Sequence, residues 1–313
     1  MEPSSRNTKA RFEYLKWSPL YEKERPFQTF LAIPDTAPDQ RRHNLVFEKG
    51  EEQVIFDLRG QEQNFSLDIH GFITAKHHSV LSPAQFKDSA NIEQVYLPEC
   101  VDLVKKLVDG ADEVFIFDWR TRQMDMDEKP GRLIDYTDAL RRVGPTARVH
   151  VDQSPLGAER RVQLHFPHRV DELLRGRVRI INLWRPLNGP IDDCPLAVCD
   201  GRTVKESDLI ETDHIKPQFT ACTQHLLYNP EMRWYYISDQ KNDEVLIFKN
   251  YDTESGVTRC KPRFILLYSL MWIADTLLGA PHSAFTPVDY PGGPFRRQSV
   301  EVRALVFTKQ PIH

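Results

Sequence analysis

Short apolar runs separated by turn residues fill much of the sequence, and they constrain the fold more than any other feature. Runs of this kind are residues 111–119, 178–184, 196–199, 234–237, 244–248 and 299–307. They are rich in β-branched and aromatic residues and are bounded by turn-forming residues, which is the pattern of β-strands. Helical spacing of apolar residues lies mostly before residue 175. The chain is therefore expected to be mainly β, a barrel or double sheet with helical flanks.

Local signals predict further elements in the first part of the chain. Turn residues between residues 44–47 and 53–58 indicate a β-hairpin. Ser82 and Pro83 are typical of the start of a helix, and Gly110 is typical of a residue that follows one. The remaining predictions are a strand over residues 65–73, a helix over residues 101–108, a polar loop over residues 121–132, a helical piece over residues 135–143 and a helical region over residues 157–174 that is broken at Pro167.

Composition indicates a globular protein and gives no reason to expect nucleic acid as a partner. The net charge is −4, so the chain lacks the positive excess that attracts nucleic acid or an anionic membrane surface. The five cysteines form no C-x-x-C pair, which is typical of a reducing compartment. The first residues contain no apolar stretch of the secretory type. We expect a cytoplasmic protein without a membrane span, and whether it forms a homo- or hetero-oligomer stays open.

The sequence predicts one domain with an extended arm. Residues 1–45 are rich in proline, charge and aromatic residues, and we expect an arm whose aromatic side chains pack on the body. Residues 46–313 are expected to form a single domain. Within it, residues 263–280 (RFILLYSLMWIADTLLGA) form an apolar insert that is marginal for a membrane span. Two explanations stay open for the insert: an additional buried or surface-packed helix, or an intron retained in the gene prediction.

A histidine and a carboxylate two positions apart suggest a metal site. His150 and Asp152 lie in an apolar, β-branched context, so they project from the same face of a strand, about 7 Å apart along it. Imidazole plus carboxylate is a ligand combination for first-row metals, and a second histidine would complete the facial triad of non-haem Fe(II) oxygenases. Taken alone, the motif is better explained by a histidine at a strand end beside a solvated aspartate.

The C-terminal part supplies residues that complete such a site. His282 lies at the start of a predicted strand, and the sequence Arg297-x-Ser299 leads into the final strand. Glu301 and Arg303 follow on the same strand face as Arg297 and Ser299. An arginine fork binds a carboxylate through two hydrogen bonds, and a nearby hydroxyl can add a third. The series offers a third metal ligand and an anchor for a dicarboxylate; the alternative is an edge strand with solvated arginines.

H-x-D, a distal histidine and R-x-S, in this order, resemble the motifs of iron(II)/2-oxoglutarate-dependent oxygenases. More narrowly, the chain resembles the cephamycin-methoxylase-component-like and gibberellin-desaturase-like group of secondary metabolism. The stretches that carry the resemblance are FSLDIHGF (65–72), VHVDQSP (149–155), RIINLWRPLNGPIDDCPLAVCD (179–200), RWYYISDQKNDEVLIFKNYD (233–252), PHSAF (281–285) and RQSVEVRALVF (297–307). They cover most of the chain from residue 65 onward. The apolar insert departs from the family pattern, which runs almost directly into H-S-A-F.

The resemblance implies a double-stranded β-helix (jelly-roll) core with helical decoration and an iron site. His150, Asp152 and His282 would bind Fe(II) and leave positions for 2-oxoglutarate and O2. The implied reaction is the oxidation of an unactivated C–H bond of a small molecule in secondary-metabolite biosynthesis. Hydroxylation, desaturation and oxidative ring closure all stay open as outcomes.

The resemblance also assigns the co-substrate anchor. Arg297, assisted by Ser299, would bind the far carboxylate of 2-oxoglutarate, with Arg303 as the reserve candidate. Arg185 either lines the pocket or braces a proline turn. Two other functions stay open: a non-catalytic jelly-roll binding or partner protein, and a metallohydrolase that uses the same three metal ligands without Arg297.

Overall fold

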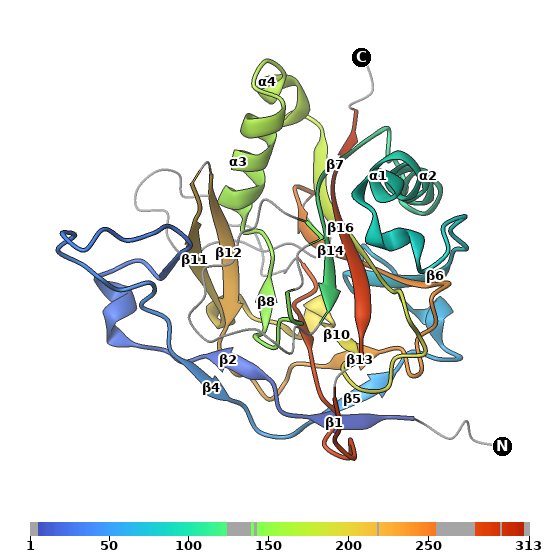
Figure 1. Ribbon diagram of the computed structural model, residues 1–313. Coiled ribbons are helices and arrows are strands. Elements are labelled where there is room, and N and C mark those ends of the chain that lie inside the picture. The colour runs from blue at the N-terminus through green and yellow to red at the C-terminus, as the bar shows by residue number, and fades with distance from the viewer. Residues whose placement is uncertain are drawn as a thin grey trace.

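The computed structural model describes residues 6–123, 139–140, 143–217, 219–254, 279–294 and 296–309, and within these residues the chain is mainly β (Figure 1). The described strands of the larger sheet follow the order β1 (Thr8–Ala10), β5 (Gln53–Asp57), β13 (Trp234–Tyr236), β10 (Leu196–Cys199), β15 (His282–Ala284), β8 (His150–Val151), β12 (Thr220–Leu226), β11 (Leu209–Ile215) and β3 (Phe27–Thr29). The smaller sheet follows the order β6 (Phe72–Lys76), β14 (Glu244–Asp252), β9 (Arg177–Pro186), β16 (Gln298–Thr308) and β7 (Glu113–Gln123). A separate pair consists of β2 (Glu13–Leu15) and β4 (Phe47–Lys49).

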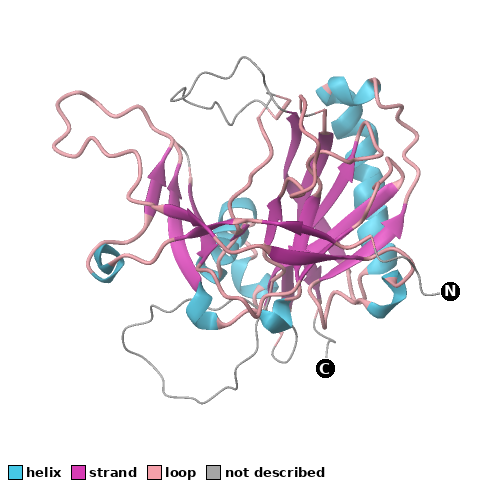
Figure 2. Cartoon of the chain, turned by 90° about the horizontal axis from the view of Figure 1, so that it is seen from below, coloured by secondary structure: helices cyan, strands magenta, loops and turns pink. Residues whose placement is uncertain are grey.

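Strand β16 divides its side chains between two environments. It pairs with β9 on one side and with β7 on the other. Alternate residues from Val300 to Val306 pack in an apolar cluster with α2 (Leu97–Leu107), which stands beside the smaller sheet in Figures 1 and 2. Ser299, which precedes them, and the intervening residues such as Arg303 project from the opposite face because side chains alternate along a strand. The alternative of an edge strand with solvated arginines is therefore wrong.

Most strands predicted from the apolar runs are confirmed. Strands β7, β9, β10, β13, β14 and β16 occupy the six predicted runs. Strand β7 is half-buried, because among the described strands it lies at the edge of the smaller sheet and pairs only with β16. It also extends into the predicted polar loop, which otherwise lies outside the described residues. The antiparallel pair of β11 and β12 has no counterpart among the predictions.

Two predicted elements are wrong. No hairpin joins residues 44–47 to residues 53–58, because β4 pairs with β2, while β5 pairs with β1 and β13. Both strands find partners elsewhere in the chain, which the local turn signal does not reveal. The strand predicted over residues 65–73 begins only at Phe72, where β6 starts, and turns occupy most of the preceding residues.

The helical segments follow the local signals more closely. They are η1 (Pro19–Glu22), η2 (Glu62–Asn64), η3 (Gln85–Lys87), α1 (Ser89–Asn91), the π-helical η4 (Ile92–Tyr96), α2, α3 (Pro155–His165), α4 (Val170–Leu173), η5 (Gly201–Thr203) and η6 (Glu206–Asp208). Helices α3 and α4 confirm the helical region that is interrupted at Pro167. The Ser154 hydroxyl accepts a hydrogen bond from the Gly157 N–H and caps α3 directly after the predicted metal motif.

The arm contributes strands β1, β2 and β3, and several of its aromatic residues are buried. Phe12 packs on Trp234 with ring centroids 4.3 Å apart, and the Tyr14 hydroxyl donates to Gln53 Oε1 over 2.6 Å. This confirms the expected packing of the arm for these residues, although Trp17 remains 42% exposed. The division of the chain at residue 45 stays a prediction.

Two predictions fall largely outside the described residues. These are the helical piece over residues 135–143 and the apolar insert over residues 263–280, of which only Gly279 and Ala280 are described. Among the helices of the described residues, none has the length and apolar character needed to cross a membrane.

Replacing Gly157 by alanine is expected to destabilise the protein. Alanine favours helices, but a Cβ at this position would lie 2.5 Å from the Cys222 carbonyl oxygen of β12. Relieving this overlap requires α3 to move away from β12, which costs about 1–3 kcal/mol. Urea unfolding of Gly157→Ala should show this loss, and Glu159→Ala, an exposed position of the same helix, should not. Equal stabilities would contradict the close packing.

Candidate metal centre

The three predicted metal ligands converge in the middle of the larger sheet. His150 in β8 lies directly opposite His282 in β15, and Asp152 follows β8. One ligand atom from each side chain fits within 4.8 Å of the other two. His150 Nε2 lies 3.6 Å from Asp152 Oδ1, and His282 Nε2 lies 3.9 Å from Asp152 Oδ2. The structure thus brings together residues that are 132 positions apart in the sequence, from 150 to 282.

Main-chain carbonyl groups fix the orientation of both imidazoles. His150 Nδ1 lies 2.8 Å from the Arg148 oxygen, and His282 Nδ1 lies 3.3 Å from the Ala280 oxygen. A carbonyl only accepts, so Nδ1 carries the proton and the Nε2 lone pair faces Asp152. Burial lowers the pKa of His282 to about 3, with a further contribution from His150. His282 is therefore neutral at physiological pH, which is the form that binds a metal ion.

Asp152 is held by side chains from the opposite sheet. Arg303 Nε donates to Asp152 Oδ2 over 2.8 Å, and Asn182 Nδ2 donates to the same oxygen over 2.6 Å. Burial alone would raise the pKa of Asp152, but the charge of Arg303 and the adjacent histidines hold it well below the usual range. Asp152 is therefore ionised, and its position is set by side chains of the protein itself.

The guanidinium of Arg303 is occupied by three carboxylates. Besides Asp152, it donates from Nη1 to Asp118 Oδ2 over 2.8 Å and from Nη2 to Glu301 Oε2 over 2.7 Å. Asn182 connects the same network, since its Nδ2 also lies 2.9 Å from Glu301 Oε1. Arg303 thus lies within an internal ion network beside the metal ligands.

Arg297 is the buried cation that faces the metal-ligand cavity. Its side chain is 2% exposed and lies over the Trp184 ring, with the guanidinium carbon 4.9 Å from the ring centroid. Nη1 donates to the Cys194 carbonyl over 2.8 Å, and Nε lies 3.4 Å from Ser299 Oγ. In the described part of the chain Arg297 forms no ion pair with a carboxylate. Burial lowers its pKa, which reflects the cost of this unpaired charge.

Asp193 fixes the main chain from which Arg297 projects. This carboxylate is 1% exposed and accepts hydrogen bonds from the N–H groups of Arg297 (2.9 Å), Cys194 (2.8 Å) and Arg296. Three main-chain donors to one buried carboxylate leave the turn little freedom. Asp193 therefore determines where the Arg297 side chain begins.

A cavity of about 20 Å³ connects the histidines to Arg297. Its lining consists of Arg122, Thr146, His150, Trp184, Leu196, His282, Ala284, Arg297 and Glu301. The space is close to that of one water molecule.

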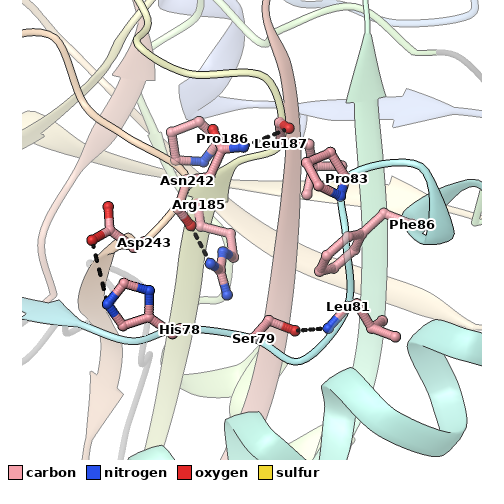
Figure 3. Close-up of a pocket in the computed structure, with 10 residues that line it drawn as sticks. All are labelled: His78, Ser79, Leu81, Pro83, Phe86, Arg185, Pro186, Leu187, Asn242 and Asp243. Carbon is pink, nitrogen blue, oxygen red and sulfur yellow. Dashed lines mark hydrogen bonds and ion pairs between the residues drawn. The ribbon is translucent and has the colours of Figure 1, made fainter.

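Arg185 lies at a different cavity, of about 130 Å³, whose lining is drawn in Figure 3. Its guanidinium donates to the carbonyl oxygens of His77 (3.2 Å) and Asn242. Asn242 Nδ2 in turn donates to the Leu187 carbonyl over 3.0 Å. These bonds hold the turn that follows β9, so Arg185 braces the proline turn and does not line the metal cavity.

Several residues of the site had no signal that sequence reasoning used. Asn182 is one polar residue within the apolar run of β9, and its position opposite Asp152 depends on the packing of two sheets. Asp118 and Asp193 likewise gain their roles only through partners distant in sequence. A lone polar residue in a buried strand was the one available signal, and Asn182 fits it.

Comparisons with known proteins agree with this architecture. The family model described as "YDMC: Oxidoreductase/YMDC permease-like domain" matches residues 12–265. The chain is 34% identical to the hydroxylase/desaturase efuI of Hormonema carpetanum, covering 81% of this chain and 82% of the relative. It is 31% identical to the alpha-ketoglutarate-dependent dioxygenase tstK of Talaromyces stipitatus, with 81% and 83% covered. The solved iron and alpha-ketoglutarate-dependent endoperoxidase NvfI matches with a TM-score of 0.75 at 26% identity, covering 97% of this chain and 99% of that one.

The chain therefore belongs to this oxidoreductase family and is related to Fe(II)/2-oxoglutarate-dependent dioxygenases and hydroxylase/desaturases. This confirms the resemblance, the enzyme class and the mainly β jelly-roll fold expected from the sequence. It also confirms the expected cofactor and co-substrates at the level of the family: Fe(II), 2-oxoglutarate and O2. The grouping of His150, Asp152 and His282 agrees with that requirement.

Acid should destabilise the metal-free protein through its buried histidines. His225 of β12 lies opposite His150, is 5% exposed, and has its pKa held well below the usual value by burial. Unfolding lets it take up a proton near pH 6.5, so its contribution to stability falls as the pH drops below that value, by about 1.4 kcal/mol per pH unit. Urea unfolding between pH 7 and 5 should show a flatter pH dependence in His225→Gln.

Exposed His168 provides the matched control for this measurement. His168→Gln should keep the pH dependence of the wild type. An identical slope in His225→Gln and the wild type would show that His225 protonates equally in the folded and unfolded states.

Proposed function

We propose that His150, Asp152 and His282 bind Fe(II) and that Arg297 binds the 2-oxoglutarate carboxylate remote from the metal. One observation carries this proposal: a fully buried guanidinium without a carboxylate partner lines the same cavity as the two metal-ligating histidines. A buried unpaired charge is costly, and an anionic ligand relieves that cost. The dicarboxylate of the family supplies such an anion.

The donor set fits the metal. Two neutral imidazoles and one carboxylate form the 2-His-1-carboxylate set that Fe(II) oxygenases use, with coordination positions left for other ligands. When bound, Fe(II) supplies the activation of O2 that is coupled to the oxidative decarboxylation of 2-oxoglutarate to succinate and CO2. The protein's contribution is the arrangement of its own side chains around that chemistry.

Different side chains of the protein bind the metal, position its carboxylate ligand and bind the co-substrate. His150 and His282 present Nε2 because main-chain carbonyls hold their Nδ1 protons. Arg303 positions Asp152 through a charged hydrogen bond, so we assign it a positioning role in place of that of reserve anchor. Arg297, assisted by Ser299, keeps a desolvated cation at the far end of the cavity, where its attraction for a carboxylate is strengthened by exclusion of water.

The substrate is proposed to be a small molecule of secondary metabolism, oxidised by hydroxylation, desaturation or ring closure. The names of the relatives support this range, since they include hydroxylase/desaturases and an endoperoxidase. Family membership favours an oxygenase over a non-catalytic binding protein, and a metallohydrolase would have no use for Arg297. We also propose a cytoplasmic location, for which the free thiols of the four described cysteines are the support.

Substitution of any proposed ligand should abolish the Fe(II)·2-oxoglutarate complex. Anaerobic addition of Fe(II) and 2-oxoglutarate to the wild type should give a visible metal-to-ligand charge-transfer band. His150→Ala, Asp152→Ala and His282→Ala should lack the band because each removes one of three protein ligands. His168→Ala, an exposed histidine, is the matched control and should retain it. Absence of the band in folded wild type, or its survival in Asp152→Ala and His282→Ala, would contradict the proposal.

The anchor is tested separately from the metal. Titrating 2-oxoglutarate into the Fe(II) protein and following the same band should give a Kd about 10–100-fold higher in Arg297→Gln, because charge-assisted hydrogen bonds to the carboxylate are lost. Asp193→Asn should raise the Kd about tenfold, since an amide holds the Arg297 main chain more weakly than a carboxylate does.

Asp192, the exposed neighbour that pairs with Arg296, offers the control. Asp192→Asn should leave the Kd unchanged. Equal Kd values for Asp192→Asn and Asp193→Asn would refute the positioning role, and an unchanged Kd in Arg297→Gln would refute the anchor.

A further inference from the structure

A second cation beside the metal site pairs with no carboxylate in the part of the chain that the structure describes. Arg161 of α3 lies between two aromatic rings, with its guanidinium carbon 4.9 Å from the Phe117 centroid and 4.3 Å from the Phe219 centroid. Within the described residues it forms no ion pair, and its Nε has no hydrogen-bond acceptor. The rings fix the plane of the guanidinium, and its Nε has no acceptor among the described residues, an arrangement suited to a carboxylate in the same plane.

The carboxylate that acts most strongly on Arg161, Asp118, already accepts a hydrogen bond from another arginine. Asp118 is the carboxylate with the largest electrostatic effect on Arg161, yet it accepts a 2.8 Å hydrogen bond from Arg303. Arg303 in turn binds Asp152 over 2.8 Å. The guanidinium of Arg303 therefore bridges Asp152 and Asp118. Because Asp118 and Asp152 both act electrostatically on Arg161, Arg161 lies in the neighbourhood of the metal centre.

Lys216 adds a further positive charge to the same region. It precedes β12 and lies close enough to Arg161 for the two charges to repel each other. Burial, together with Arg161, Arg303 and Arg120, lowers the pKa of Lys216 to about 8, against the opposing effect of Asp118. Lys216 thus adds to the positive potential around Arg161, whose buried Nε lacks an acceptor among the described residues, and an anion at Arg161 would relieve the cost of that burial.

We propose that Arg161 binds a carboxylate of the substrate, so that the enzyme oxidises an organic acid with an apolar skeleton. This inference rests on the proposed function of the metal centre and adds the substrate class. Arg297 and Arg161 then have separate tasks, one toward the co-substrate and the other toward the substrate. Phe117 and Phe219 provide apolar surface for the part of the substrate next to its carboxylate.

The test compares an acid with its neutral amide. Isothermal titration calorimetry of the anaerobic Fe(II)·2-oxoglutarate protein with 4-phenylbutyrate and 4-phenylbutanamide should show at least about tenfold tighter binding of the acid. Arg161→Gln should remove this preference. Arg161→Lys, which keeps the charge but loses the planar fork, should retain part of it. Arg175→Gln, at an exposed position, is the matched control and should behave as the wild type.

Two results would overturn the inference. One is equal binding of the acid and the amide by the wild type. The other is a preference for the acid that persists in natively folded Arg161→Gln. The charge-transfer band, recorded in the same samples, separates this inference from the proposed function, because the anion site consists of protein side chains and is measured whether or not the band forms. A missing band counts against the metal centre, whereas a band without acid preference counts against Arg161 alone.

Discussion

The hydrogen-bonded ion pair between Arg303 and Asp152 is the interaction on which the site depends. Arg303 belongs to β16 of the smaller sheet, and Asp152 follows β8 of the larger one, so the pair connects the two layers at the metal centre. Both side chains are largely buried, and removing one partner of such a pair typically costs about 3–5 kcal/mol. The same bond that joins the sheets keeps Asp152 ionised and oriented. The fold and the proposed metal site therefore share one carboxylate.

The alternation of β16 explains how one strand serves both needs. One face packs on α2 and contributes to the apolar core, while the other presents Ser299, Glu301 and Arg303 to the interior between the sheets. Arg297 precedes the strand and is set by Asp193. The proposed co-substrate anchor Arg297 and the proposed positioning residue Arg303 thus come from a single stretch of seven residues, 297–303.

The sequence predicted the parts of the structure that depend on local pattern or on motif order. Short β-branched runs identified six strands. The H-x-D motif, the distal histidine and R-x-S identified His150, Asp152, His282 and Arg297, which the structure brings together. Pairings between distant strands were beyond local signals, which is why the hairpin over residues 44–58 was wrong. The roles of Asn182, Asp193 and Arg161 depend on neighbours brought close by tertiary packing, and residue type alone does not specify those neighbours.

The Fe(II) affinity of Arg303→Lys tests most directly whether the Arg303–Asp152 pair creates the metal site. Lysine retains the charge but presents its donors from a single nitrogen, so it does not reproduce the planar fork with which Arg303 spans Asp152, Glu301 and Asp118. Anaerobic calorimetry should show Fe(II) binding about 10–100-fold weaker than in the wild type, with Arg296→Lys, an exposed arginine of the preceding turn, unchanged. Wild-type affinity in natively folded Arg303→Lys would contradict the account.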